Sequence, residues 1–255
     1  MRFEIKYIVP VYQLQLLREM IRPFIRPDKH VADRPDHQYT VRSIYYDTPD
    51  LLFYREKIEG VPYRLKLRIR SYDQASDKAP VFLEIKRKHM IPMTKDRAPL
   101  PYGLVRDIFG KDKGLQYAQS FLKPKQLEDF SHFMYHMKKE SLVPTVLVVY
   151  DREPYEALSD PSIRVTFDKS LRSAPKPDLT QLFSEDLKPV MENHFILEVK
   201  YDREYPEWMR LIVHQLGLKQ QAASKYCMSI DNHPYLLRMK NWQWILSGKR
   251  PLSDV

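Results

Sequence analysis

The clearest chemical signal in the sequence is a run of alternating cations in the segment 63–72, YRLKLRIRSY. Its basic residues alternate without a break with aliphatic ones: Arg64, Lys66, Arg68 and Arg70 against Leu65, Leu67 and Ile69. Successive side chains of a β-strand point to opposite faces, so this pattern predicts a strand with one positively charged face. Guanidinium and ammonium groups bind phosphate oxygens by charge-assisted hydrogen bonds. The run therefore favours a phosphate-binding surface built on a strand.

A second strand pattern, 81–88 (VFLEIKRK), repeats this arrangement and adds a carboxylate. Glu84 and Lys86 share one face there, and Lys95 extends the positive charge further along the chain. In the segment 194–202 (HFILEVKYD), a glutamate and a lysine again lie two residues apart. Cations and carboxylates are therefore expected to meet on the same sheet face.

The carboxylate Glu198, two residues before Lys200, has two interpretations. A Glu next to a Lys is most often an ordinary ion pair of small energetic value. Beside bound phosphates, however, a carboxylate can hold Mg²⁺ or Mn²⁺, which also takes phosphate oxygens and water as ligands. The residues alone leave both interpretations open.

The elements that must position these residues are read from hydrophobic periodicity. Further strands are expected at 2–9, 39–46, 145–153 and 161–169, where apolar and polar residues alternate or β-branched residues dominate. Helices are expected at 11–25, near Asp50, and at 206–216 and 224–230; residues 101–140 read as an inserted helical subdomain, and 231–255 as a C-terminal tail. Without repeats or low-complexity linkers, residues 1–255 are predicted to form one domain.

Charged faces on so many strands have a consequence for the fold. One amphipathic strand usually separates core from water, but here the polar faces carry long cations rather than Thr, Ser and Gln. If the sheet closes with helices outside it, the charged faces converge inside a barrel. Cations held so close together repel one another and require carboxylates, water or an anionic ligand. We therefore expect an α+β protein with a basic tunnel that accepts polyphosphate compounds.

Composition and charge exclude several other classes. The chain has 255 residues, a net charge of +9 and a single cysteine, Cys227, so we expect a cytoplasmic protein without disulfides. The longest apolar stretch, 143–150, is too short to span a membrane. Cations interleaved with aliphatic residues on strands do not favour nucleic-acid binding. Six glycines, and histidines without metalloprotease spacing, give no support to a glycine-rich phosphate loop or a zinc hydrolase.

In these segments the chain resembles the VTC (vacuolar transporter chaperone) domain, the polyphosphate polymerase branch of the triphosphate tunnel metalloenzyme, or CYTH-like, superfamily. The matching segments are FEIKY (3–7), SIYYDTPDLLFY (43–54), RLKLRIRSY (64–72), VFLEIKRK (81–88), VVYDREPYE (148–156), IRVTFDKSL (163–171), FILEVKY (195–201), PEWM (206–209) and SKYCMSI (224–230). They occur in family order along nearly the whole chain.

The resemblance implies a closed eight-stranded antiparallel tunnel barrel with helices outside. It also implies a transferase that binds ATP and extends inorganic polyphosphate with Mn²⁺ or Mg²⁺. Carried over position by position, the catalytic cations are Lys6, Arg68, Arg70, Lys86, Arg152, Arg164 and Lys200. Substrate binding falls to Lys95, Tyr150, Ser224 and Lys225, and metal binding to Glu198. Tyr150 fits either a nucleoside contact or a core position.

Departures from the family pattern leave alternatives open. The superfamily often begins with an ExExK strand, but Arg2 replaces the first acid here and leaves only Glu4 and Lys6. A triphosphatase that uses water as acceptor would need nearly the same residues, and a non-catalytic polyphosphate-binding subunit is a third interpretation. The resemblance supplies no membrane span, so any membrane partner would be a separate protein.

Overall fold

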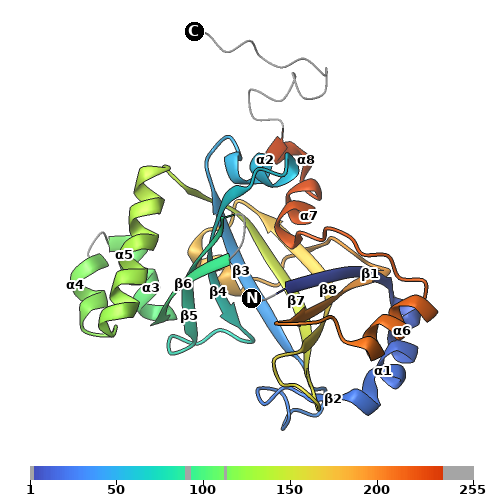
Figure 1. The fold of residues 1–255 in the computed structure, drawn as a ribbon. Helices are drawn as coiled ribbons and strands as arrows, with labels where there is room; N and C mark the ends of the chain where they lie inside the picture. The colour runs from blue at the N-terminus through green and yellow to red at the C-terminus, as the bar shows by residue number, and fades with distance from the viewer. Residues whose placement is uncertain (1–2, 90–92, 112–113, 238–255) are drawn as a thin grey trace.

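The alternating segments of the sequence form one antiparallel sheet, and the segments with helical spacing pack against it (Figure 1). The computed structural model describes residues 3–89, 93–111 and 114–237. The strands are β1 Phe3–Pro10, β2 Ile25–Pro27, β3 Tyr39–Asp47, β4 Tyr63–Tyr72, β5 Pro80–His89, β6 Met93–Pro101, β7 Val143–Ala157, β8 Arg164–Pro175, β9 Lys188–Pro189 and β10 His194–Tyr201. The helices are α1 Leu14–Ile21, α2 Leu52–Ile58, α3 Tyr102–Lys111, α4 Gly114–Gln119, α5 Pro124–Lys139, α6 Glu207–Gln215, α7 Lys225–Asp231 and α8 Pro234–Leu237, with 3₁₀ turns η1 Val11–Gln13, η2 Arg22–Phe24 and η3 Leu179–Phe183.

Local sequence signals explain where the elements begin and end. The helix expected at 11–25 is α only from Leu14 to Ile21, because Pro23 ends it in a 3₁₀ turn and β2 follows. Strand β8 begins three residues after the predicted start, since Asp160 opens a turn by accepting the backbone N–H groups of Ser162 and Ile163. The two short strands β2 and β9 were not predicted.

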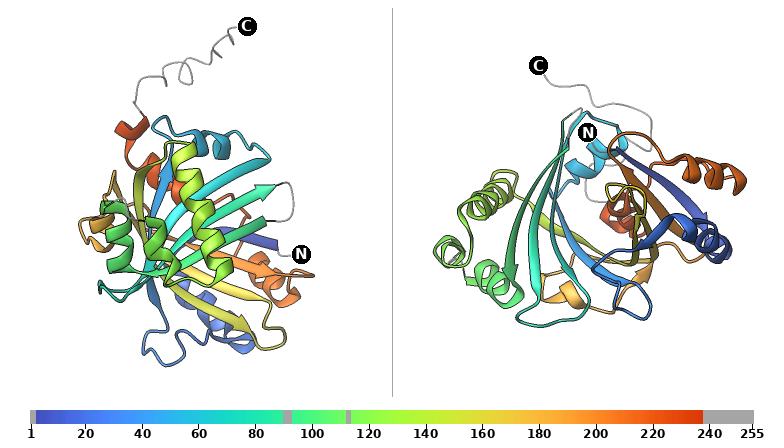
Figure 2. Two further views of the ribbon diagram at one scale, coloured as in Figure 1. Left: turned by 90° about the vertical axis from the view of Figure 1, so that its left-hand side faces the viewer. Right: turned by 60° about the horizontal axis from the view of Figure 1, so that its bottom comes forward.

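The prediction of a closed barrel is wrong. The hydrogen-bonded strand order is β1-β10-β8-β7-β3-β4-β5-β6, and β2 and β9 pair with β7 and β8, which makes ten strands in all. Eight strands form the main path, but within the described ranges no pairing joins β1 to β6. The sheet instead curves around an interior and stays open between these two strands, as the right-hand view of Figure 2 shows.

The free edge of β1 is covered by residues 220–223, where the sequence showed no strand pattern. Gln221 donates its backbone N–H to the carbonyl oxygen of Lys6 at 2.9 Å, and Tyr7 bridges to Gln220. The Lys6 ammonium donates to the carbonyl of Ala223 at 3.3 Å. This segment leads into α7 and occupies hydrogen-bonding groups of β1 that a closed barrel would pair with β6.

Apolar clusters attach the helices to the sheet and determine which face is charged. In one cluster, the outer face of strands β3, β4, β5 and β6 packs against helices α3, α4 and α5. In a second cluster, the outer face of strands β1, β8 and β10 packs against helices α1 and α6. A third cluster packs α7 and α2 against inward side chains of β3 and β7. Helix α7 therefore lies within the curve of the sheet (Figure 2), and its first residue faces the charged interior.

The inserted helices and part of the C-terminal tail lie within the described residues. Helices α3, α4 and α5 lie in the range 101–140 that was read as helical. Of the tail expected at 231–255, residues 238–255 lie outside the described residues. No helix in the described part of the chain combines the length and apolar character needed to cross a membrane.

Candidate functional site

Strand register brings the predicted site residues together on the concave side of the sheet, here called the inner face. Residues paired across antiparallel strands share a face. The pairs include Lys6 with Glu198, Arg152 with Asp168, Arg68 with Glu84, and Lys86 with both Lys66 and Lys95. Charges from strands distant in the sequence therefore lie beside one another.

One group of charges surrounds Glu198 on β10. Its carboxylate pairs with Lys200 on the same strand, with Lys6 on β1 at 3.6 Å, and with Lys225 at the start of α7 at 4.0 Å. Glu4 lies beside them and pairs with Lys6 at 2.7 Å. Burial disfavours the charge on Glu198, but the three lysines outweigh it and hold the pKa of this carboxyl well below its usual value.

Asp168 on β8 extends this group. Arg152 donates two hydrogen bonds to its carboxylate, at 2.7 and 2.8 Å, and the Lys225 ammonium contacts it as well. Ser224 caps α7 by accepting the backbone N–H of Cys227. Its hydroxyl also accepts a hydrogen bond from Lys66 at 3.1 Å, so the start of α7 is fixed against the inner face.

A second group surrounds Glu84 on β5, whose side chain is fully buried. Arg68 pairs with Glu84 at 2.6 Å, Lys95 at 2.5 Å and Arg97 at 3.2 Å. Burial would raise the pKa of Glu84, but the surrounding cations, with Arg68 first, lower it strongly. The Glu84–Lys86 pair suggested by the spacing is absent among the described ion pairs, because Glu84 turns to the neighbouring strands β4 and β6.

Lys86 is an inner-face cation whose charge is poorly compensated. It forms no ion pair with any carboxylate in the described part of the chain. The positive charge of Arg68, followed by burial and Arg70, holds its pKa well below the usual lysine value. Lys66, directly across on β4, has its pKa lowered by burial. This part of the inner face therefore has positive charge to offer to an anion.

Tyr150 lies among the cations and is 3% exposed. Its hydroxyl accepts a hydrogen bond of 3.4 Å from Arg70, and the ammonium of Lys225 lies 4.7 Å from its ring centre. Tyr45 accepts a hydrogen bond from Arg68 at 2.9 Å. Burial opposes ionisation of Tyr45, yet Arg68, Arg70 and Lys66 lower its pKa to about 8. Both tyrosines hold guanidinium groups in place, which favours the core interpretation of Tyr150.

Arg164 is a predicted site residue whose ion pair lies outside both groups. Its side chain is 46% exposed and pairs with Asp28 at 3.6 Å, at the first residue of β8. It lies across from Lys200 in the register, so it belongs to the rim of the inner face.

Comparison with known proteins assigns the family. A model of the VTC domain matches residues 1–232. This chain belongs to the VTC domain family. The resemblance drawn from the strand segments is thus confirmed. No curated protein shows a significant match.

Two solved structures resemble this VTC domain. One is an adenylyl cyclase candidate from Hippeastrum, HpAC1, described as having a dominant triphosphatase activity; it is 12% identical, with 91% of this chain and 96% of that chain covered and a TM-score of 0.52. The other is an adenylate cyclase candidate from Vibrio parahaemolyticus, 9% identical, with 89% and 97% covered and a TM-score of 0.43. At this identity, the likeness to HpAC1 shows that the fold is shared.

The donor chemistry around Glu198 fits a hard divalent cation. Glu4 and Glu198 lie close enough on β1 and β10 that each raises the cost of ionising the other, and both share Lys6 as partner. Oxygen ligands of this kind suit Mg²⁺ or Mn²⁺ when phosphate oxygens complete the shell. The ammonium groups of Lys6 and Lys200 lie on flexible stems, so they can move from the carboxylates to phosphate oxygens.

Sequence reasoning missed several members of the site. Asp168, Glu84, Glu4 and Arg97 were not counted among the functional residues, although each lies in a strand pattern on the charged face. Lys66 belonged to the four-cation run and could have been selected on that signal. Asp168 required the position of α7, which only the tertiary structure gives.

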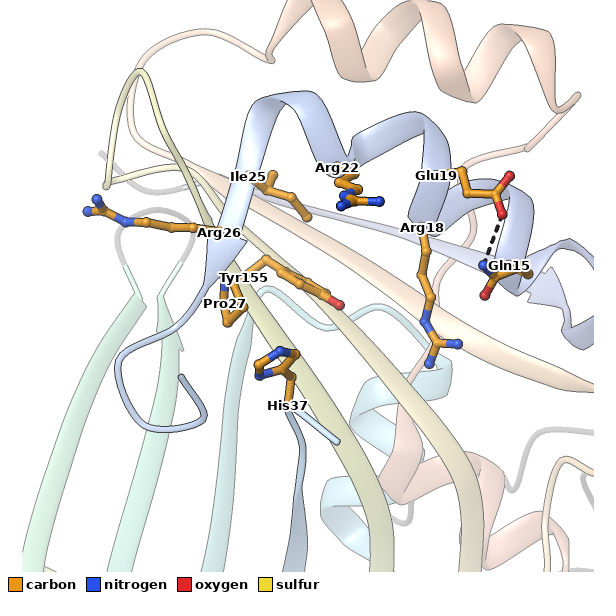
Figure 3. A pocket seen from close by; sticks show the side chains of 9 residues that line it. All are labelled: Gln15, Arg18, Glu19, Arg22, Ile25, Arg26, Pro27, His37 and Tyr155. Carbon is orange, nitrogen blue, oxygen red and sulfur yellow. Dashed lines mark hydrogen bonds between the residues drawn. The ribbon is translucent and has the colours of Figure 1, made fainter. Parts of the chain in front are cut away.

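A separate cavity lies on the outer side of the sheet and does not include the inner face. Its volume is about 470 Å³, and residues of α1, η2, β2 and β7 line it, among them Arg18, Arg22 and Tyr155 (Figure 3). The Arg18 guanidinium is bound to the buried carboxylate of Glu153 at 2.6 and 2.9 Å. This contact fastens α1 to β7.

Proposed function

We propose that this VTC domain binds the phosphates of ATP and of inorganic polyphosphate on its inner face and transfers the terminal phosphoryl group of ATP to the growing chain. The observation that carries the proposal is the surplus of positive charge there. The cations are Lys6, Lys66, Arg68, Arg70, Lys86, Lys95, Arg97, Arg152, Lys200 and Lys225, against the carboxylates Glu4, Glu84, Asp168 and Glu198. An anion with several charges would offset this surplus.

The arginines are the fixed part of the proposed binding surface. Arg68 and Arg152 are each oriented by a carboxylate, Glu84 and Asp168, and Arg70 by hydroxyl groups. A guanidinium held in this way presents its remaining N–H groups in a defined direction, as positioning a triphosphate requires. Lys86, with Lys95 beside it and Ser224 and Lys225 at the start of α7, would bind further phosphates of the chain.

The proposed reaction needs no covalent intermediate on the protein. A terminal phosphate oxygen of the polyphosphate chain attacks the γ-phosphorus of ATP, a new P–O–P linkage forms, and the bond to the β-phosphate oxygen breaks as ADP leaves. A Mn²⁺ or Mg²⁺ ion held by Glu198 would neutralise charge on the phosphate oxygens. Lys6, Lys200 and Arg152 lie around Glu198 and would stabilise the equatorial oxygens in the transition state.

Triphosphate hydrolysis is the second candidate activity. It is supported by the fold shared with HpAC1, whose dominant activity is described as that of a triphosphatase. The same cations would hold the triphosphate, and water would replace the polyphosphate end as acceptor. The non-catalytic interpretation has less support, because Glu198 and its lysines come together on the inner face. Cytoplasmic location and a separate membrane partner stay predictions.

One assay separates these activities. Purified protein is incubated with ATP and Mn²⁺, with and without a short polyphosphate primer, and ADP, free phosphate and polymer are measured in parallel. We expect ADP together with a nuclease-resistant, polyphosphatase-sensitive polymer, and free phosphate as a minor product. Conversion of nearly all released phosphorus into orthophosphate or pyrophosphate would replace the polymerase by a triphosphatase. No turnover, with retained binding of tripolyphosphate, would favour the binding subunit.

A further inference from the structure

We propose that the outer surface between β6 and α5 holds a divalent transition-metal ion through Asp96, Asp129 and His132, at a second site distinct from the inner face. Asp129 and His132 are three residues apart on α5, so they lie on the same side of the helix. Asp96 comes from β6, the edge strand against which α5 packs. One ligand atom from each of the three residues lies within 4.8 Å of the other two.

The backbone of β6 orients one of the carboxylates. The N–H of Arg97 donates to Oδ2 of Asp129 at 3.0 Å, which fixes the side chain and leaves Oδ1 without a hydrogen-bond donor in the described structure. The Asp129 side chain is only 10% exposed. Oδ1 pairs with the ammonium of Lys125 at 3.2 Å, on a side chain that is 71% exposed and also pairs with Glu128. A solvent-exposed lysine is a partner that a metal ion can displace.

The mixture of donors indicates the class of metal. Two carboxylate oxygens with one imidazole nitrogen suit Zn²⁺, Co²⁺ or Mn²⁺, whereas Mg²⁺ and Ca²⁺ prefer oxygen alone. His132 Nδ1 already lies 3.1 Å from Asp96 Oδ2, and its side chain is 45% exposed, so an ion can enter from solvent.

The competing interpretation is a simple network of ion pairs. Arg87 on β5 pairs with Asp96 at 2.6 Å and is 28% exposed. If the cluster is only a network of ion pairs, Arg87 stabilises it by pairing with Asp96. If the cluster binds a metal ion, Arg87 competes with that ion for the same oxygen of Asp96. The two interpretations therefore predict opposite consequences of removing Arg87.

A metal at this position would act on the inner face through β6. Asp96 lies between Lys95 and Arg97, both of which contact Glu84 from the other side of the strand. Joining Asp96 to α5 would fasten the edge strand and hold these cations in place. This consequence needs no particular reaction on the inner face.

The test is Zn²⁺ binding by the full chain, measured by calorimetry in a Glu198→Gln background that weakens the inner metal site. The visible absorption of bound Co²⁺, which depends on its coordination geometry, gives a second readout. We expect one Zn²⁺ per chain, with affinity at least about 10-fold weaker after His132→Ala or Asp129→Asn. His214→Ala, an exposed histidine on α6, is the matched control and should change nothing.

Arg87→Ala gives the decisive comparison, because it should raise Zn²⁺ affinity by about 5- to 10-fold as the competing charge is removed. Equal binding by the His132→Ala and His214→Ala variants, or an unchanged or weaker affinity after Arg87→Ala, would show a plain ion-pair network and overturn the proposal. Absence of polymer synthesis by the unmodified protein, with Zn²⁺ binding intact in the Glu198→Gln background, would refute the proposed function and leave this site standing.

Discussion

The two buried glutamates of the inner face, Glu84 and Glu198, are surrounded by different kinds of cation. Glu84 is 0% exposed and is held by Arg68 at 2.6 Å, with Lys95 and Arg97 on its other oxygen. Glu198 is 5% exposed, and its partners are lysines of which Lys6 and Lys200 are each 24% exposed. One oxygen of Glu84 is therefore fixed by the buried guanidinium of Arg68, although Lys95 and Arg97 on its other oxygen are about two-fifths exposed. Around Glu198, every ion-pair partner is a lysine on a flexible stem.

The difference follows from the chemistry of the two side chains. A guanidinium bound to a carboxylate keeps its direction and its charge, whereas an ammonium on a four-carbon stem can turn to another oxygen at small cost. We therefore propose that Glu84 holds in place the arginines of the proposed phosphate-binding surface. Glu198, which lysines can leave, is the better place for a metal ion that arrives together with phosphates. Substitutions at the two glutamates and at their cations test this difference.

The largest effect is expected for Glu84→Gln. Losing this charge leaves Arg68 and its neighbours buried without compensation, which should reduce the free energy of unfolding by about 3 to 5 kcal/mol. Urea denaturation followed by circular dichroism measures it, with the exposed Glu128→Gln as control. A loss below about 1 kcal/mol would mean that Glu84 is not the structural centre of its group.

Glu198→Gln should instead remove activity and spare the fold. A neutral amide of nearly the same shape is a poor metal ligand, so metal-dependent turnover should fall on the order of 100- to 1000-fold. The loss of stability should be smaller than for Glu84→Gln, because Lys6 and Lys200 can reach water. Turnover equal to that of the unmodified protein at saturating Mn²⁺ would exclude the metal role.

Arg68→Ala and Arg152→Ala should both weaken tripolyphosphate binding, by about 1.5 to 3 kcal/mol each, because each removes a charge-assisted contact. Adenosine binding should change little. Calorimetry checks both ligands, and Arg210→Ala on the surface of α6 serves as control. Unchanged tripolyphosphate affinity in both variants would place the binding surface elsewhere.

Lys86→Met should have the smallest effects, and they should have opposite signs. The folded protein disfavours the charge on Lys86, so the variant should be more stable without ligand, by about 1 kcal/mol, yet bind tripolyphosphate more weakly. Thermal unfolding with and without tripolyphosphate measures both, with the exposed Lys219→Met as control. A variant that is less stable without ligand would show that Lys86 has a carboxylate partner.

The same lysine gives a pH dependence with a definite sign. The pKa of Lys86 is lower in the folded than in the unfolded chain. At pH values between these two pKa values, the unfolded chain binds more protons than the folded chain. The contribution of Lys86 to the free energy of unfolding therefore rises with pH in that window. Tripolyphosphate favours the charged form, so affinity should fall as pH rises through the same window. Lys86→Met should remove this part of both dependences.

The sequence predicted much of the local structure and which side chains share the charged face of a strand. Unbroken alternation of cations with aliphatic residues, as at Lys66 and Arg68, fixes a strand and its charged face, because side-chain direction in a strand depends only on position parity. Segments with long patterns, such as β1, β4 and β10, were therefore placed within a residue or two.

Only the tertiary structure decided which charges pair and how the sheet ends. Sequence spacing suggested that Glu84 pairs with Lys86, but register places Arg68 and Arg97 beside it from neighbouring strands. Likewise, the closed barrel fails because the segment at Gln220 and Gln221 occupies the free edge of β1, an interaction across more than 200 residues. The local pattern of a strand determines which face of the sheet a side chain points to. The ion-pair partners of that side chain and the pairing of the sheet edges depend on contacts between distant segments, and a local pattern carries no information on those contacts.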